Sequence, residues 1–279
     1  LDGVAVPHTG LLILDGTAPH VVDPEIPGAR DSIINLGECL DEPAMRPRLP
    51  HIRACMADHA VCSRRARACL AAAAALARDN AAVLQAATDE ERLFRMTQAL
   101  IQAVLASDAP KDAVPRARPI ITDAITPKGE ISLIAENAQP RVIRLLFHWG
   151  MDGTAVLRQI SAAAHAAGYS TEEHLCPTVP ERLLHVSIPA LSTLITTGDQ
   201  LAAEQTFDFA ACIPQSALLR HECALEQGRA GIQLHLHRAS AALAQAKQFH
   251  DELESFYVPN MDFAKWQTML DQTLESLKS

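Results

Sequence analysis

The residues with the clearest potential for chemistry lie in the loop Phe147–Thr154, which reads FHWGMDGT. An apolar stretch, Val142–Phe147, precedes this loop, and an amphipathic stretch from Thr154 to Ala167 follows it. A strand, a glycine-containing turn and a helix in this order are typical of a phosphate-binding loop, where backbone N–H groups and the helix N-terminus face an anion. The pattern therefore predicts an anion site. Its candidate cofactor-binding residues are Gly150, Asp152, Gly153 and Thr154.

The same loop departs from the motif that binds nucleotide phosphates. G-x-x-x-x-G-K-[ST] places a Lys on the β- and γ-phosphates and a hydroxyl on Mg²⁺. If Thr154 is taken as the hydroxyl, Gly153 stands in place of the Lys, and if Gly153 is the second glycine, Thr154 stands there. Both alignments lack the Lys and the first glycine, and Asp152 adds negative charge where phosphates would lie. We therefore expect a degenerate Walker A loop that binds ATP and Mg²⁺ weakly or not at all and does not hydrolyse ATP.

A second candidate is Asp15, which follows the apolar run Leu11–Leu14. Such a run is typical of a parallel strand that is covered on both faces. An acid at the carboxyl end of a buried strand is where α/β proteins place groups that handle metal or water. Asp15 is therefore a candidate catalytic residue of the Walker B type. The alternative is a loop aspartate that caps the next helix, and the sequence leaves both interpretations open.

Composition limits the classes of partner. The 279 residues are 48% apolar, enough for one large core or two modest ones. A net charge of −9 argues against nucleic acid or an anionic membrane as the main partner. No apolar run reaches the roughly 18 residues that a membrane-spanning helix needs. The seven cysteines include no C-x-x-C pair, which favours reduced thiols in a cytoplasmic protein.

Hydrophobic periodicity predicts an α/β protein. Apolar runs predict strands near 119–124, 171–176 and 184–196. Residues 29–107 have helical periodicity and are rich in alanine, which predicts two or three long helices that form an antiparallel hairpin. Residues 216–279 are also expected to be helical. The predicted fold is a P-loop NTPase-like parallel sheet with long helical insertions.

Two segments of the chain match at an offset of 182 residues. Residues 1–16 align with residues 183–198, and the matched positions include Val4 with Val186, Pro7 with Pro189, Leu12 with Leu194 and Ile13 with Ile195. This match predicts an internal duplication into two related units. We expect residues 1–138 to form a truncated first α/β unit with a helical hairpin insertion, and residues 139–279 to form a second P-loop-like unit with C-terminal helices. The phosphate loop of the first unit would precede Leu1.

Several short motifs carry a family resemblance. They are Asp15–Pro24, Ile34–Glu38, Gly168-Tyr169, Cys176-Pro177, His185–Pro189 and, most specific, His250–Phe263, which reads HDELESFYVPNMDF. With these motifs the chain resembles an uncharacterised bacterial family of tandem P-loop ATPase-like proteins over nearly its whole length. The resemblance implies two nucleotide-binding cores per chain, each with a Walker-type loop. The chain departs from that pattern at the degraded loop 147–154 and at the first loop, which the sequence does not contain.

Histidine and cysteine patterns favour packing over metal binding. The stripe His51, Cys55, His59, Cys62 and Cys69 has helical spacing, so a pair within it could share a metal ion. However, 11 residues of helix from His51 to Cys62 span about 16 Å, too far for one ion. We expect these side chains to pack a helical hairpin, His235 and His237 to be solvated, and His250 with Glu254 to form a side-chain network. No metal site is predicted.

Three functions remain open from the sequence. The first is a non-hydrolysing P-loop NTPase-like protein. The second is an active ATPase whose competent loop precedes Leu1 and uses Asp15. The third is a structural protein that docks partners through its helical hairpins. The expected partners are a nucleotide, another protein or a second copy of the chain, because the strand Leu11–Leu14 would present an open edge or an uncovered apolar face.

Overall fold

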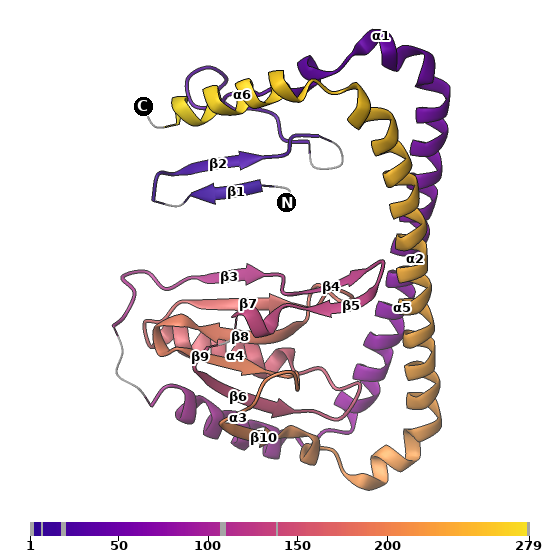
Figure 1. Ribbon diagram of the computed structural model, residues 1–279. Helices are drawn as coiled ribbons and strands as arrows, with labels where there is room; N and C mark the ends of the chain where they lie inside the picture. The colour runs from indigo at the N-terminus through magenta and orange to yellow at the C-terminus, as the bar shows by residue number, and fades with distance from the viewer. Residues whose placement is uncertain (1–2, 7, 18–20, 107–109, 138, 278–279) are drawn as a thin grey trace. The chain divides into compact units, whose positions relative to one another are not determined.

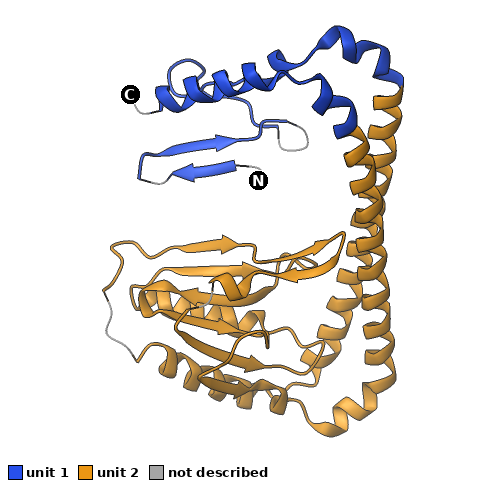
Figure 2. Ribbon diagram, in the orientation of Figure 1, with its two compact units in different colours: residues 1–50, 254–279 blue, residues 51–253 orange. Residues whose placement is uncertain are grey.

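The computed structural model describes residues 3–6, 8–17, 21–106, 110–137 and 139–277 (Figure 1). The chain divides into two compact units, coloured separately in Figure 2. Unit 2 contains residues 51–253, and unit 1 combines the two ends of the chain, residues 1–50 and 254–279. The units therefore do not follow the boundary at 138/139 that the sequence suggests.

Unit 2 is built on a six-stranded sheet. Its strands are β3 (Ala117–Ile120), β6 (Arg141–Leu146), β7 (Thr171–Leu175), β8 (Leu183–Ile188), β9 (Thr193–Thr196) and β10 (Gln205–Asp208). Their order is β10-β6-β9-β8-β7-β3, and β8 alone runs against the other five. The sheet is therefore mixed, and the expectation of a parallel sheet was too simple. The reversal arises because short connections join β8 to both β7 and β9, whereas a parallel crossover needs a dozen or more residues.

The strand, loop and helix predicted around residue 147 are present. β6 lies between β9 and β10 and pairs parallel with both. The helix α4 (Thr154–Ala166) opens directly after the loop, and it buries Val156, Leu157 and Ile160 on one face. Shortly after its last residue, Ala166, comes Gly168, whose φ of +95° favours glycine, and the N–H of Tyr169 reaches back to the carbonyl of Ala164. This part of the sequence prediction is confirmed.

The main core lies between this sheet and two helices, α4 and α3 (Glu90–Val104), on one face (Figure 1). It contains fully buried residues from β6, β8 and β9 and from both helices, including Ile143, Val186, Leu157 and Leu100. Because strand side chains alternate between the two faces of a sheet, the next residues along β8 point the other way. They are polar, and they meet a second layer.

That second layer is a β-hairpin of β4 (Asp123–Thr126) and β5 (Gly129–Ser132), followed by the 3₁₀ turn η3 (Ile134–Asn137). The sequence predicted one strand over 119–124. The structure instead breaks this stretch after Ile120, so that β3 joins the large sheet and β4 begins the hairpin. The N–H of Leu133 donates to the carbonyl of Thr122, which closes the layer.

Two long helices extend from unit 2: α2 (Leu49–Ala86) and α5 (Gln215–Tyr257). They lie side by side (Figure 1), with Cys55 Sγ 3.0 Å from the carbonyl of Phe249. The following buried residues are spaced by three, four, seven or eleven positions, which keeps them on one face of each helix: Ile52, Cys55, Cys62, Ala66 and Ala73 on α2, and Leu225, Gly228, Ala239, Ala242 and Ala246 on α5. The hairpin expected within residues 29–107 is therefore wrong, because the partner of α2 comes from the far end of the chain.

Unit 1 is small and sparsely buried. Its elements are β1 (Gly3–Val6), β2 (Leu11–Leu14), η1 (Leu36–Cys39), α1 (Glu42–Met45), η2 (Arg46–Arg48), η6 (Val258–Asn260) and α6 (Phe263–Ser276). β2 pairs antiparallel with β1 in a two-stranded sheet, and residues 12–14 are exposed. The prediction of a buried parallel strand at Leu11–Leu14 is therefore wrong for the described residues.

The pairing of β1 with β2 repeats that of β8 with β9. Val6 faces Leu11 in one pair and Ile188 faces Thr193 in the other, and both positions differ by 182 residues. The turns also correspond, since Gly10 has φ +69° and Ser192, 182 positions later, has φ +48°. Pro7, one of the residues matched in the sequence, lies outside the described residues. The sequence match thus coincides with a shared strand register.

A second set of contacts recurs at an offset of 173. In unit 1, Cys39 Sγ lies 3.4 Å from Met269 Sδ, and in unit 2 Cys212 Sγ lies 3.6 Å from Met96 Sδ. The backbone N–H of Asp262, the N-cap of α6, donates to the carbonyl of Cys39 at 2.8 Å. The N–H of Asp89, the N-cap of α3, donates to the carbonyl of Cys212 at the same distance. In each unit, a 3₁₀ turn from one half of the sequence binds a helix from the other half.

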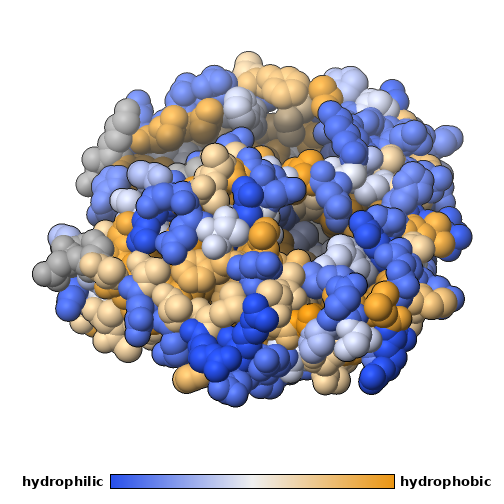
Figure 3. Space-filling view, turned by 90° about the horizontal axis from the view of Figure 1, so that it is seen from below, coloured by the Kyte–Doolittle hydropathy of each residue, from blue (hydrophilic) through white to orange (hydrophobic). Residues whose placement is uncertain are grey.

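The surface mixes polar and apolar residues. The face seen from below carries hydrophobic side chains in several patches among hydrophilic ones (Figure 3). Within the described residues, no helix combines the length and the hydropathy needed to cross a membrane.

Candidate functional site

In the loop between β6 and α4, the acidic side chain of Asp152 lies at the N-terminus of α4, where the sequence predicts an anion site. Asp152 Oδ1 accepts the backbone N–H of Thr154 at 2.9 Å, at the N-terminus of α4. Its other oxygen, Oδ2, lies 2.8 Å from Nε of Arg182. A carboxylate at a helix N-terminus is favoured by the helix dipole in the same way as a phosphate. The Arg182 side chain is 15% exposed and that of Asp152 is 33% exposed, so the pair is partly shielded from water.

Both candidate glycines are required by packing. Gly150 has φ +91°, and a Cβ there would lie 3.3 Å from the Leu84 side chain on α2. A Cβ at Gly153 would lie 2.6 Å from the Phe147 ring, which itself stacks on Phe209 with centroids 5.2 Å apart. These glycines therefore allow the loop to lie against α2 and the core, which explains their presence without a ligand.

The remaining loop residues are also engaged. Thr154 Oγ1 accepts the backbone N–H of Leu183 at 3.0 Å, so the hydroxyl expected to reach Mg²⁺ binds the start of β8. Met151 packs on a small cluster that includes Leu84 and Leu225. The Trp149 ring lies 5.3 Å from the guanidinium of Arg229. These residues do not fit ATP and Mg²⁺, because no Lys is present and the polar groups of the loop bind one another.

Asp15 lies in unit 1, directly after β2. Its Oδ1 accepts both the backbone N–H and the hydroxyl of Thr17, at 2.9 and 2.7 Å. This is an Asx-type turn, and in the described residues the next helical element begins only at Leu36, so the structure does not show Asp15 as a helix cap. By the strand register shared with unit 2, the position that corresponds to Asp15 is Thr197, the first residue after β9. The loop 147–153 and Asp15 belong to different units.

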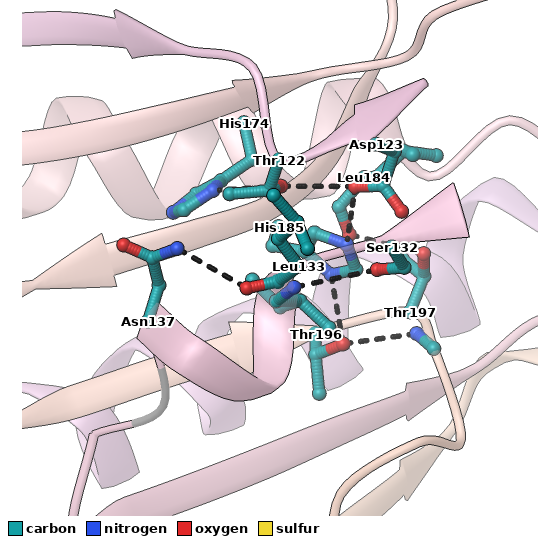
Figure 4. Close-up of polar contacts among 12 residues, drawn as sticks. Thr122, Asp123, Ser132, Leu133, Asn137, His174, Leu184, His185, Thr196 and Thr197 are labelled. Carbon is teal, nitrogen blue, oxygen red and sulfur yellow. Dashed lines mark hydrogen bonds and ion pairs between the residues drawn. The ribbon is translucent and has the colours of Figure 1, made fainter. Parts of the chain in front are cut away.

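A polar cluster between the large sheet and the β4–β5 hairpin was not predicted (Figure 4). His185 on β8 contacts the Thr196 hydroxyl through Nδ1 at 2.8 Å, and its Nε2 lies 3.6 Å from Asp123 Oδ2. His174, its cross-strand neighbour on β7, contacts Thr122 Oγ1 at 3.2 Å and Ser187 Oγ at 3.0 Å. Both histidines are buried, since His174 is 0% exposed and His185 is 3% exposed.

Burial and charge set the protonation states in this cluster. Burial lowers the pKa of His174 to about 4, and the neighbouring His185 contributes to that shift. Burial would by itself raise the pKa of Asp123, but contacts with His185, Ser132 and Thr122 outweigh it and lower the pKa to about 2. His174 is therefore neutral and Asp123 ionised near pH 7. Asp123, at the start of the hairpin, lies close to His185 on the sheet, and Thr122 beside it contacts His174, so polar groups of the two layers meet here.

The order Asp123, His185, Thr196 resembles a catalytic relay in its residue types. A catalytic hydroxyl must reach its substrate, and Thr196 is only 1% exposed. The cluster therefore acts as a polar layer that fixes the hairpin on the sheet. A sequence signal for it exists, because His185 and Ser187 alternate with the apolar residues of β8. That period of two marks the side of the strand that faces away from α4.

The histidine and cysteine stripe of α2 packs only in part, against α5 and not within the expected hairpin, because His51 is exposed. Cys55 and Cys62 are buried and contact α5, and all seven cysteines are free thiols. His237 is exposed, whereas Nδ1 of His235 is buried and has no hydrogen-bond partner in the described structure, so the prediction of solvation is wrong for His235. In the part of the chain that is described, no three His, Cys, Asp or Glu side chains are grouped to hold a metal ion.

Comparisons with known proteins add no assignment. No family model matches the chain, and neither a curated protein nor a solved structure matches it.

Proposed function

We propose that unit 2 is a non-hydrolysing relative of P-loop NTPases, in which Asp152 has replaced a bound phosphate. The single observation that supports this most directly is the position of Asp152. Its carboxylate accepts the N–H of Thr154 at the start of α4 and pairs with Arg182. A phosphate in this position would meet a negative charge instead of the Lys that stabilises phosphoryl transfer. The loop keeps the order of strand, glycine turn and helix, and under this proposal the Asp152 carboxylate takes the place of a bound anion.

The loop's second role is structural under this proposal. Phe147, Gly150 and Met151 join it to α2, α5 and the core of unit 2. Thr154 joins it to β8. A loop with these contacts positions the base of the long helices relative to the sheet of the same unit. The form of the loop would then serve the scaffold and not catalysis.

The test is nucleotide binding and turnover by the full chain. We expect calorimetry with ATP and Mg²⁺ to show no saturable binding at the 147–154 loop, and phosphate release to stay at background. Thr154→Ala and the conservative Thr154→Ser should leave that background unchanged. ATP turnover that Thr154→Ala abolishes and Thr154→Ser retains would contradict the proposal.

One observation favours an alternative, an ATPase site in unit 1 that uses Asp15. β2 corresponds to β9 by strand register, and β9 pairs parallel with β6, the strand that leads into the loop 147–153. A strand placed beside β2 as β6 lies beside β9 would end next to Asp15. Asp15 would then hold Mg²⁺ or position water beside a competent phosphate loop. ATP turnover that is unaffected by Thr154→Ala but lost in Asp15→Asn would favour this alternative.

A further inference from the structure

The middle of the α2–α5 helix pair concentrates positive charge in a chain that is negative overall. On α2 no acidic residue occurs between Asp58 and Asp79, and on α5 none occurs between Glu226 and Asp251. The cationic residues in these two stretches are Arg64, Arg65, Arg67, Arg78, Arg229, Arg238 and Lys247. The chain as a whole carries a formal charge of −9. This section of the helix pair is therefore locally basic, although the chain as a whole is acidic.

Some of these cations are neutralised by partners on the same unit. Arg78 pairs with Glu181 at 2.5 Å, and Lys247 pairs with Asp251 at 2.6 Å. Arg229 pairs with Glu226 at 3.9 Å and also lies over Trp149. Arg64, Arg65, Arg67 and Arg238 form no ion pair within the described residues of the chain. Four guanidinium groups thus lack a counter-charge in one part of the helix pair.

Two of these four arginines line one hollow. It has a volume of about 420 Å³, and Arg65, Cys69, Arg238, Ala241, Ala242 and Gln245 line it. Arg65 comes from α2 and Arg238 from α5, at positions 173 residues apart, the same offset that relates Cys39 to Cys212. The corresponding positions of two antiparallel helices therefore contribute one arginine side chain each to the lining of the same space.

The rest of the lining is small and apolar. Cys69, Ala241 and Ala242 expose no charge, and Ala242 is only 3% exposed. Gln245 directs its Oε1 toward Cys62 Sγ at 3.9 Å, so its amide NH₂ is the group that it can offer to a ligand. The lining of the hollow is thus mostly apolar and includes two arginines and one glutamine, and its volume lies in the range of small-molecule sites.

We propose that this hollow binds a phosphomonoester that carries a compact apolar group. Guanidinium groups bind phosphate oxygens through paired N–H donors, and two of them match the double negative charge of a phosphomonoester. The wall of Cys69, Ala241 and Ala242 suits the apolar group of the ligand. A long polyanion fits less well, because the acidic remainder of the chain would repel it. This site is separate from the loop 147–154, so the proposal does not depend on the function proposed above.

The experiment is calorimetric titration of the full chain with phenyl phosphate, and with inorganic phosphate in parallel. We expect saturable binding of phenyl phosphate, with weaker binding of inorganic phosphate because it cannot contact the apolar wall. Arg65→Gln and Arg238→Gln should each weaken the binding of phenyl phosphate by roughly tenfold. Glutamine preserves helix propensity, so these variants should fold. Arg64→Gln is the matched control, since Arg64 is adjacent and unpaired but does not line the hollow.

Specific outcomes would overturn the proposal. Absence of saturable phenyl phosphate binding would do so directly. Equal weakening by Arg64→Gln and Arg65→Gln would show attraction to diffuse positive charge and not a site. If inorganic phosphate binds as tightly as phenyl phosphate, the apolar wall does not contribute to binding and the proposed class of ligand is wrong.

Discussion

Asp152 and Arg182 form an ion pair, Oδ2 to Nε 2.8 Å, that joins the N-terminus of α4 to the residue before β8. Asp152 also caps the N–H of Thr154, so one side chain performs two separable tasks. The cap needs an oxygen acceptor, whereas the pair with Arg182 needs a charge. Substitutions at this position can therefore distinguish the two contributions.

We expect Asp152→Asn to lose the ion pair but retain the cap, and Asp152→Ala to lose both. The hydrogen bond of Asp152 to the Thr154 N–H, made from the residue before the N-cap Gly153, contributes about 1 kcal/mol, and the partly shielded pair adds on the order of 1 kcal/mol. Urea unfolding should therefore rank stability as wild type, then Asp152→Asn, then Asp152→Ala. In the double variant Asp152→Asn with Arg182→Gln, the cost should be smaller than the sum of the single costs. Additive costs would mean that the two side chains do not interact in solution.

The buried histidine His174 predicts a loss of stability in mild acid. Its pKa is about 4 in the folded chain, below the ordinary value of 6.5. The unfolded chain therefore binds a proton between these values while the folded chain does not. The stability that neutral His174 contributes is complete above pH 6.5 and is lost as the pH falls toward 4, up to about 3 kcal/mol.

The measurement is the free energy of unfolding in urea at pH 7, 5.5 and 4.5. His174→Gln removes the titrating group, so its stability should fall less steeply across this range than that of the wild type. Asp123, whose pKa is about 2, contributes a second loss only below its ordinary value of 3.8. Parallel curves for wild type and His174→Gln would contradict the assigned protonation state of His174.

The sequence alone located β6, α4, β7 and the C-terminal helices, because apolar residues recur at a regular spacing within each of these segments. It missed the pairing of α2 with α5 because that contact joins residues about 190 positions apart, as between Cys55 and Phe249. It assigned the apolar run Leu11–Leu14 to a buried sheet, whereas the neighbours of a strand decide its burial. For the loop 147–154 the missing Lys was visible, but the ion pair of Asp152 depends on Arg182, which only the fold brings near.

The contact between Gly228 on α5 and Asn80 on α2 gives a third prediction. Alanine forms helices better than glycine by about 1 kcal/mol. However, a Cβ at Gly228 would overlap Oδ1 of Asn80 and lie 2.6 Å from its Nδ2, and Asn80 is 2% exposed. Gly228→Ala should therefore destabilise the chain by on the order of 1–3 kcal/mol, as overpacking does.

Two variants control this prediction. Gly231→Ala places its Cβ 2.7 Å from the tip of the flexible Leu76 side chain, which can move, so its effect on the melting temperature should be smaller. Asn80→Ala removes the overlapping atoms, so the double variant Gly228→Ala with Asn80→Ala should melt above Gly228→Ala alone. If Gly228→Ala melts at or above the wild-type temperature, the close approach of α2 and α5 at this point is wrong.

The last prediction concerns β1 and β2 of unit 1. Val4, Leu12 and Ile13 are 50%, 58% and 41% exposed, whereas the residues 182 positions later are all 0% exposed. In unit 2 the corresponding strands are covered by α4 and flanked by β6 and β7. The β1–β2 pair has the same apolar character but lacks these neighbours among the described residues. Neither strand contains a charged residue that would oppose pairing with another chain.

We therefore expect the chain to self-associate through β1 and β2, with a sedimentation coefficient that rises with protein concentration. Leu12→Lys places a charge in the middle of β2 and should shift the chain toward monomer, while circular dichroism confirms that the helices are retained. Phe94→Lys is the matched control, because Phe94 is also exposed, at 60%, but lies on α3 of unit 2. A monomer at all concentrations, or an equal effect of the two lysine variants, would mean that the exposed strands do not drive association. In that case the apolar residues of β1 and β2 remain exposed to water without pairing, despite their match to the buried strands β8 and β9.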